Sequence, residues 1–82
     1  MDMKFGAIWS MEEGIDMWEE GYTTLEKIWD IDAHGNVCSV LLKGTRAIDV
    51  LIATDELIGL TGDSHHCYLE GVNADGRVRM GS

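Results

Sequence analysis

Two short polar loops, each containing a glycine and each lying between β-rich runs, constrain the fold of this chain more than any other feature. A glycine within a polar loop of about five residues between such runs is typical of a β-hairpin. The sequence contains no proline, so glycine, asparagine and aspartate must make its turns. We therefore predict two hairpins. Their loops are residues 32–36 and 73–76, and the flanking runs are residues 24–31, 37–43, 65–72 and 77–80.

The segment from Ser10 to Gly21 combines a helix signal with an unusual distribution of charge. Ser10 and Glu13 match the S-x-x-E capping box, and Gly21 stands where helices commonly end. Apolar residues follow one side of the expected helix, and only carboxylates follow the other. We predict a helix at residues 11–20 with Trp18 buried. The carboxylates of its outer face are Glu12, Glu13, Asp16, Glu19 and Glu20.

Other interpretations of the N-terminal region stay open. We favour a strand at residues 4–9 before the helix, but a helix from Phe5 to Glu13 followed by a strand is an alternative. A heptad-like spacing of apolar residues from 11 to 29 would instead extend the helix. Gly21 and the threonines that follow it are poor residues for a helix interior, which counts against the longer helix.

The C-terminal half completes an α+β prediction. Residues 46–53 are strongly apolar and are typical of a central buried strand. Thr54 is expected to cap a single helical turn at residues 55–58. The result is a single domain, residues 1–82, with a small antiparallel sheet of five to six strands and one amphipathic helix on a face. We expect the core to centre on Trp18, Trp29 and residues 48–52.

The charge of the chain narrows the classes of partner. The net charge is −9, and residues 1–33 hold nine acids but only two bases. Nucleic-acid binding relies on Lys and Arg to neutralise phosphates, so we expect no direct nucleic-acid partner. An acidic protein is instead attracted to basic surfaces. The sequence lacks an apolar run of about 18 residues and a recognisable signal peptide, so we expect a cytoplasmic protein without a membrane partner.

The acidic run predicts a docking surface for a basic protein. Like charges at helical spacing cost about 1–2 kcal/mol in total. Glu19 and Glu20 also lie at the unfavourable end of the helix dipole, so stability alone does not explain them. Small acidic inhibitors of nucleases, repair enzymes and CRISPR complexes use such surfaces as DNA mimics; the likeness is one of surface, not of family. We predict a non-enzymatic protein that blocks a basic, often nucleic-acid-binding site, such as a viral anti-defence inhibitor, an antitoxin or an immunity protein. A solvated helix face without a partner is the alternative.

A second functional hypothesis rests on the cations. They could line a site for a small anionic ligand, such as a nucleotide signal, in an oligomeric sequestering protein. This requires the C-terminal hairpin to lie beside the strand at residues 37–43. A homo-oligomer stays open in either case. The ligand-binding residues would be Lys43, Arg46, Arg77 and Arg79.

No metal, cofactor or catalytic site is expected. Zinc prefers four tetrahedral ligands, and the spacing of the histidines and cysteines is poor for that geometry. The motif that begins at Asp30 resembles a calcium loop but has Leu41 where a glutamate is needed. A thiol nucleophile would need a base held by a third group, and we find none. The cysteines are expected to be buried thiols. The weak metal candidates are His34, Cys38, His65, His66 and Cys67.

Overall fold

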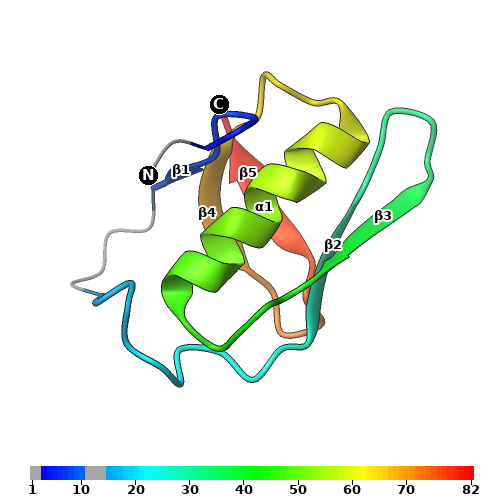
Figure 1. The fold of residues 1–82 in the computed structure, drawn as a ribbon. Helices are drawn as coiled ribbons and strands as arrows, with labels where there is room; N and C mark the ends of the chain where they lie inside the picture. The colour runs from blue at the N-terminus through cyan, green and yellow to red at the C-terminus, as the bar shows by residue number, and fades with distance from the viewer. Residues whose placement is uncertain (1–2, 11–14) are drawn as a thin grey trace.

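The fold is α+β, as predicted, although the helix lies in an unexpected place. The computed structural model in Figure 1 describes residues 3–10 and 15–82. Within these residues five strands and one helix are formed. In chain order they are β1 (Ile8–Trp9), β2 (Lys27–Ile31), β3 (Val37–Leu41), α1 (Ala47–Thr61), β4 (Tyr68–Val72) and β5 (Val78–Gly81).

Both predicted hairpins are confirmed. β2 and β3 are antiparallel, with Ile31 opposite Val37 at the turn, and β4 and β5 are antiparallel with a bulge near Leu69. In the described part of the chain, the strands form a three-stranded sheet, β1-β4-β5, and a two-stranded sheet, β2-β3. A bridge from Trp29 to Arg77 links β2 to β5. The strands therefore follow the order β3-β2-β5-β4-β1, and α1 lies across one side of them (Figure 1).

The N-terminal strand corrects the prediction of a purely antiparallel sheet. β1 runs parallel to β4, with Ile8 opposite Tyr68. The strand is shorter than the predicted residues 4–9 because the preceding amides have another acceptor. The Asp55 carboxylate of α1 accepts hydrogen bonds from the amides of Phe5 (2.9 Å) and Ala7 (3.1 Å). The alternative helix starting at Phe5 is also not formed over residues 5–10.

Residues 46–53, predicted as a buried strand, instead form the first half of α1. A short apolar run does not distinguish a buried strand from a buried helix, because both lack a polar face. The signals that decide it lie at the ends. Asp49 accepts the backbone amide of Arg46 at 3.0 Å in a capping box. Gly62 is left-handed at φ 73° and donates to the Ile58 carbonyl at 2.9 Å.

Thr54 was predicted to cap a separate helical turn, but it lies inside α1. Its side chain is fully buried, and its hydroxyl donates to the Val50 carbonyl at 2.8 Å. A threonine that bonds the preceding turn is satisfied within a helix and does not terminate it. The predicted short turn at residues 55–58 is therefore part of the same continuous helix.

The predicted helix at residues 11–20 is wrong for residues 15–20, which form turns. Residues 11–14, including Glu12 and Glu13, lie outside the described residues. Asp16 accepts the Trp18 amide at 2.9 Å, and such local bonds compete with helix formation. Trp18 is 61% exposed instead of buried. Gly21 is left-handed, as expected, but at φ 87° it belongs to a turn. The longer helix considered for this region is likewise not formed over residues 15–29.

The core lies between α1 and the strands, and the predicted tryptophans do not centre it. Trp29 is only half-buried, and its indole N–H donates to the Asp75 carbonyl at 3.1 Å. The largest fully buried side chains belong to Ile28, Val50, Thr54 and Leu69.

The helix described here, α1, is too short to cross a bilayer.

Candidate functional site

The acidic segment that was expected to be a helix is held against the beginning of α1 by backbone contacts. The Gly21 amide donates to the Thr45 hydroxyl at 3.0 Å, and the Thr23 amide donates to the Thr45 carbonyl at 3.0 Å. In return, the Ile48 amide in the first turn of α1 donates to the Met17 carbonyl at 3.1 Å. The segment is thus positioned by residues more than twenty places later in the chain.

This segment forms an open depression with carboxylates around it. Of the five predicted partner-binding acids, the structure brings together Asp16, Glu19 and Glu20, and all three are exposed. Glu12 and Glu13 are outside the described residues. We refer to this surface as the acidic depression. Its lining residues are Ile15, Asp16, Glu19, Glu20, Gly21 and Tyr22.

The cation nearest to these acids is engaged elsewhere. Arg46 makes a two-pronged ion pair with Asp49, with Nε and Nη2 at 3.0 and 2.9 Å from the carboxylate oxygens. The Asp49 hydrogen bond, followed by smaller contributions that include Glu20, raises the pKa of Arg46. The same hydrogen bond lowers the pKa of Asp49. The guanidinium also lies 6.0 Å from the Trp18 ring. Among the described residues, none of the three acids of the depression forms an ion pair, although Arg46 is close enough to Glu20 for a weak electrostatic interaction.

The residues of the second hypothesis do not gather into one site. The C-terminal hairpin lies beside β2 and not beside β3, which the hypothesis required. Arg77 lies 5.2 Å from the Trp29 ring and 3.5 Å from Asp30 on β2. The Arg79 guanidinium covers Gly71 on β4, in the space that a side chain would otherwise take. These two arginines are therefore used within the sheet.

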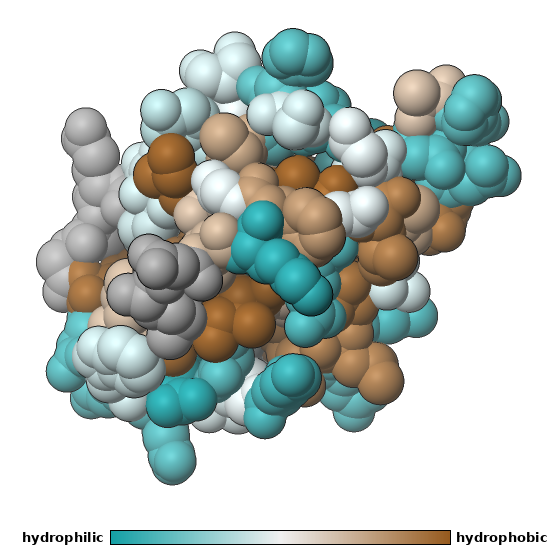
Figure 2. All heavy atoms as spheres, turned by 45° about the horizontal axis from the view of Figure 1, so that its top comes forward, coloured by the Kyte–Doolittle hydropathy of each residue, from teal (hydrophilic) through white to brown (hydrophobic). Residues whose placement is uncertain are grey.

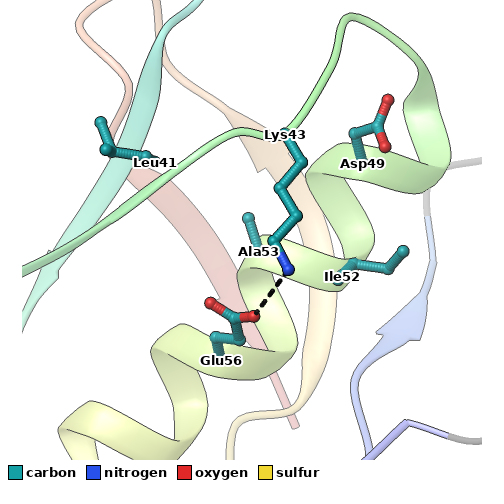
Figure 3. A pocket seen from close by; sticks show the side chains of 6 residues that line it. All are labelled: Leu41, Lys43, Asp49, Ile52, Ala53 and Glu56. Carbon is teal, nitrogen blue, oxygen red and sulfur yellow. Dashed lines mark ion pairs between the residues drawn. The ribbon is translucent and has the colours of Figure 1, made fainter.

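Lys43 lies apart from them, at a small pocket between the β3–α1 connection and α1 (Figure 3). Its Nζ is 4.0 Å from Glu56 Oε1; the Lys43 side chain is largely exposed, and that of Glu56 is about half exposed. Asp49 also lines the pocket, but its carboxylate is paired with Arg46, and the other two charged side chains of the lining, Lys43 and Glu56, lie close to each other. Such a lining does not favour a phosphate or another anion.

The histidines and cysteines are spread over two loops and a strand. Within residues 3–10 and 15–82, no three His, Cys, Asp or Glu side chains are grouped so as to hold a metal ion. Cys38 and Cys67 are free thiols and are only partly buried. A contact that the sequence did not suggest links His66 Nδ1 to Asp63 Oδ2 at 2.8 Å. Both of these side chains are about half exposed, so the contact is a surface one.

The sequence also did not reveal how much apolar surface the first hairpin exposes. Figure 2 shows hydrophobic residues reaching the surface among hydrophilic ones. On the hairpin, Leu41 is 73% exposed, Val37 is 67% exposed and Ile31 is 38% exposed. The alternation of Val37, Ser39 and Leu41 along the chain is the signal for one exposed strand face. The sequence predicts the strand but does not indicate that this face stays uncovered in the described structure.

Comparison of the chain with protein-family models, with curated proteins and with solved structures gives no match.

Proposed function

We propose that this protein is a small, acidic, non-enzymatic binding protein whose acidic depression docks on a basic site of a partner protein. The observation that carries the proposal is the grouping of Asp16, Glu19 and Glu20 around one open surface, with none of the three in an ion pair among the described residues.

The depression suits a lysine or arginine side chain of the partner. Charged hydrogen bonds to carboxylates are stronger than neutral ones, and several carboxylates around one cation add geometric specificity. Ile15 and Tyr22 line the same surface, and they offer apolar contact to the aliphatic stem of such a side chain. Exposed charges of one sign also speed the encounter with an oppositely charged site.

The chemistry of the partner follows from that of the depression. A site rich in lysine and arginine is commonly one that binds nucleic acid, so occupation by an acidic protein would block it. An anti-defence inhibitor of viral origin, an antitoxin and an immunity protein all work by this kind of occlusion. We place the encounter in the cytoplasm. The competing hypothesis of a sequestered anionic ligand has less support, because its four cations lie in separate contacts.

The test compares two triple variants with the same change in net charge. Asp16→Asn, Glu19→Gln and Glu20→Gln remove the charges of the depression, and asparagine keeps an oxygen for the Trp18 amide. The control variant carries Glu→Gln at three exposed positions on other elements, and its far-UV circular dichroism should match that of the first. The control positions are Glu26, Glu56 and Glu70.

The wild type and both variants are each immobilised to capture a partner protein. The binding of each of the three proteins to the captured partner is then titrated. We expect the control triple to bind within about threefold of wild type. The depression triple should lose roughly 3- to 150-fold, since each of the three exposed charge pairs contributes about 0.2–1 kcal/mol. Equal binding by the two triples would show that the total charge matters and the depression does not, and would overturn the proposal.

A further inference from the structure

The backbone of β3 leaves a regular row of hydrogen-bonding groups unused. The bonds that bracket the β2–β3 ladder, Asp32 N to Asn36 O and Leu42 N to Glu26 O, are both 2.9 Å long. Because hydrogen-bonded pairs alternate along an antiparallel ladder, the even-numbered residues of β3 direct their N–H and C=O groups to β2 and the odd-numbered ones direct theirs away. The residues that direct these groups away are Val37, Ser39 and Leu41.

A contact on β2 supports this assignment. Trp29 lies opposite Ser39, but its amide donates to the Gly76 carbonyl on the other side, at 3.0 Å. The pair formed by Trp29 and Ser39 is therefore not hydrogen-bonded. β3 ends the strand order of the described chain, so its outer edge has no strand beside it there.

The free edge is complementary to itself. Val37 and Leu41 lie at equal distances on either side of Ser39. If a second copy of β3 runs antiparallel about Ser39, each Val37 pairs with the Leu41 of the other copy, and the two Ser39 residues pair with each other. All three outward-directed residues then form hydrogen-bonded pairs. Two-fold symmetric contacts of this kind are the commonest form of homodimer interface.

The charge distribution also favours a second copy at this edge. The chain carries a net charge of −9, so most contacts between two copies are repulsive. β3 contains no charged residue, no proline and no bulge, which are the usual means of protecting an edge strand. In the pairing about Ser39, the end of β3 that is followed by Lys43 lies beside the β2–β3 turn of the other copy. The Lys43 side chain is 78% exposed. In that turn the Asp32 carboxylate accepts backbone hydrogen bonds, chiefly from Asn36, that lower its pKa.

We propose that two copies of this chain pair through β3 to form a four-stranded sheet, β2-β3-β3-β2, with a two-fold axis at Ser39. Pairing would place the exposed side chain of Val37 against that of Leu41 in the other copy. Stable interfaces bury at least roughly 1,200 Å² in total, with about 20–30 residues on each side. An interface built on the five residues of β3 is smaller than this, so the dimer should be weak. It should dissociate at micromolar concentration and form as the concentration rises. The proposal is independent of the acidic depression.

Sedimentation equilibrium of the whole chain tests the proposal. We expect the mass to rise from 9.1 kDa towards twice that value between about 10 and 500 µM, the range of a weak interface. Ser39→Lys should raise the dissociation constant about tenfold or more, because it places two like charges opposite each other at the axis. Ser64→Lys makes the same chemical change at an exposed turn and should leave the constant unchanged.

Amide hydrogen exchange of the wild type locates the interface and does not depend on any variant. The amides of Cys38 and Val40 should be protected at every concentration, since they bond to β2. The outward amides, above all that of Ser39, should become protected only at high concentration. A chain that stays at 9.1 kDa throughout, or a dimer whose Ser39 amide exchanges as freely as in the monomer, would overturn the proposal.

Discussion

Replacing Asp55 with alanine should loosen the attachment of the N-terminal segment to α1 and cost a large part of the stability of the protein. The Asp55 side chain is 5% exposed, and its Oδ1 accepts the amides of Phe5 and Ala7. The same segment is held further on by β1, where the Ile8 amide donates to the Cys67 carbonyl at 2.8 Å. Asp55→Ala therefore removes the acceptor but not the strand pairing that follows it.

The magnitude follows from the burial of the two donors. Ala7 is 6% exposed, so its amide would stay unsatisfied, at a cost of about 1–3 kcal/mol. Phe5 is 46% exposed, so its amide can turn to water, and its bond contributes about 1 kcal/mol. Asp55→Ala should thus cost about 2–4 kcal/mol. Asp55→Asn keeps a neutral oxygen acceptor and should cost about 1 kcal/mol. A domain of 82 residues typically has only about 4–12 kcal/mol in total.

Urea denaturation followed by tryptophan fluorescence measures the difference. Glu56→Ala is the matched control, because it removes a neighbouring carboxylate that is exposed and weakly paired. We expect the urea midpoint to be highest for wild type and Glu56→Ala, lower for Asp55→Asn and lowest for Asp55→Ala. An Asp55→Ala midpoint equal to that of Glu56→Ala would refute the reasoning, since it would mean that the buried carboxylate contributes nothing through these two bonds.

Three further predictions follow from other contacts. Hydrogen bonding to Arg46 lowers the folded-state pKa of Asp49, so its contribution is complete above the unfolded pKa, about 3.9, and is lost as the pH falls through the folded value. Asp49→Asn should accordingly flatten the decline of the urea midpoint below about pH 4. Gly76→Ala should cost more in denaturation than Gly35→Ala: both glycines have positive φ, but only at Gly76 would a Cβ lie 2.8 Å from a backbone oxygen. Trp18→Ala should change the free energy of unfolding by less than about 1 kcal/mol, because this ring is 61% exposed; a larger loss would return Trp18 to the core.

The hairpins could be predicted because their signals are local. A glycine in a polar loop and β-rich runs on each side are all contained in about twenty residues. β2, β3 and β4 fall inside the predicted runs, and β5 extends one residue beyond its run, to Gly81. Gly35 and Gly76 adopt the positive φ that such loops favour, at 82° and 93°. The parallel pairing of β1 with β4 has no such signal, because the two strands are about sixty residues apart.

The sequence predicted a helix at residues 11–20 and a buried strand at residues 46–53, whereas the helix forms at Ala47–Thr61, and this error has a physical reason. α1 buries residues on nearly every side, including Asp49, Thr54 and Asp55, so its sequence lacks the alternation that marks a surface helix. The segment around Asp16 has that alternation, but its described residues, 15–20, form turns, with the Asp16 side chain accepting the Trp18 amide. Its turn is set by Thr45 and Ile48, which no local pattern could indicate. Three of the five predicted acids are therefore together, although they are not on a helix.

The two proposed surfaces differ in charge, and this difference links the sequence to both. The acidic depression is in the part of the chain that carries most of the net charge, whereas β3 carries none. Attraction to a basic partner should weaken as salt screens the carboxylates. Pairing of two β3 edges brings together copies that repel overall, so the same salt should strengthen it. Added salt should therefore lower the affinity of the acidic depression for its partner and raise the affinity of two β3 edges for each other. A neutral edge is the surface at which a chain of charge −9 meets least repulsion from its own copy.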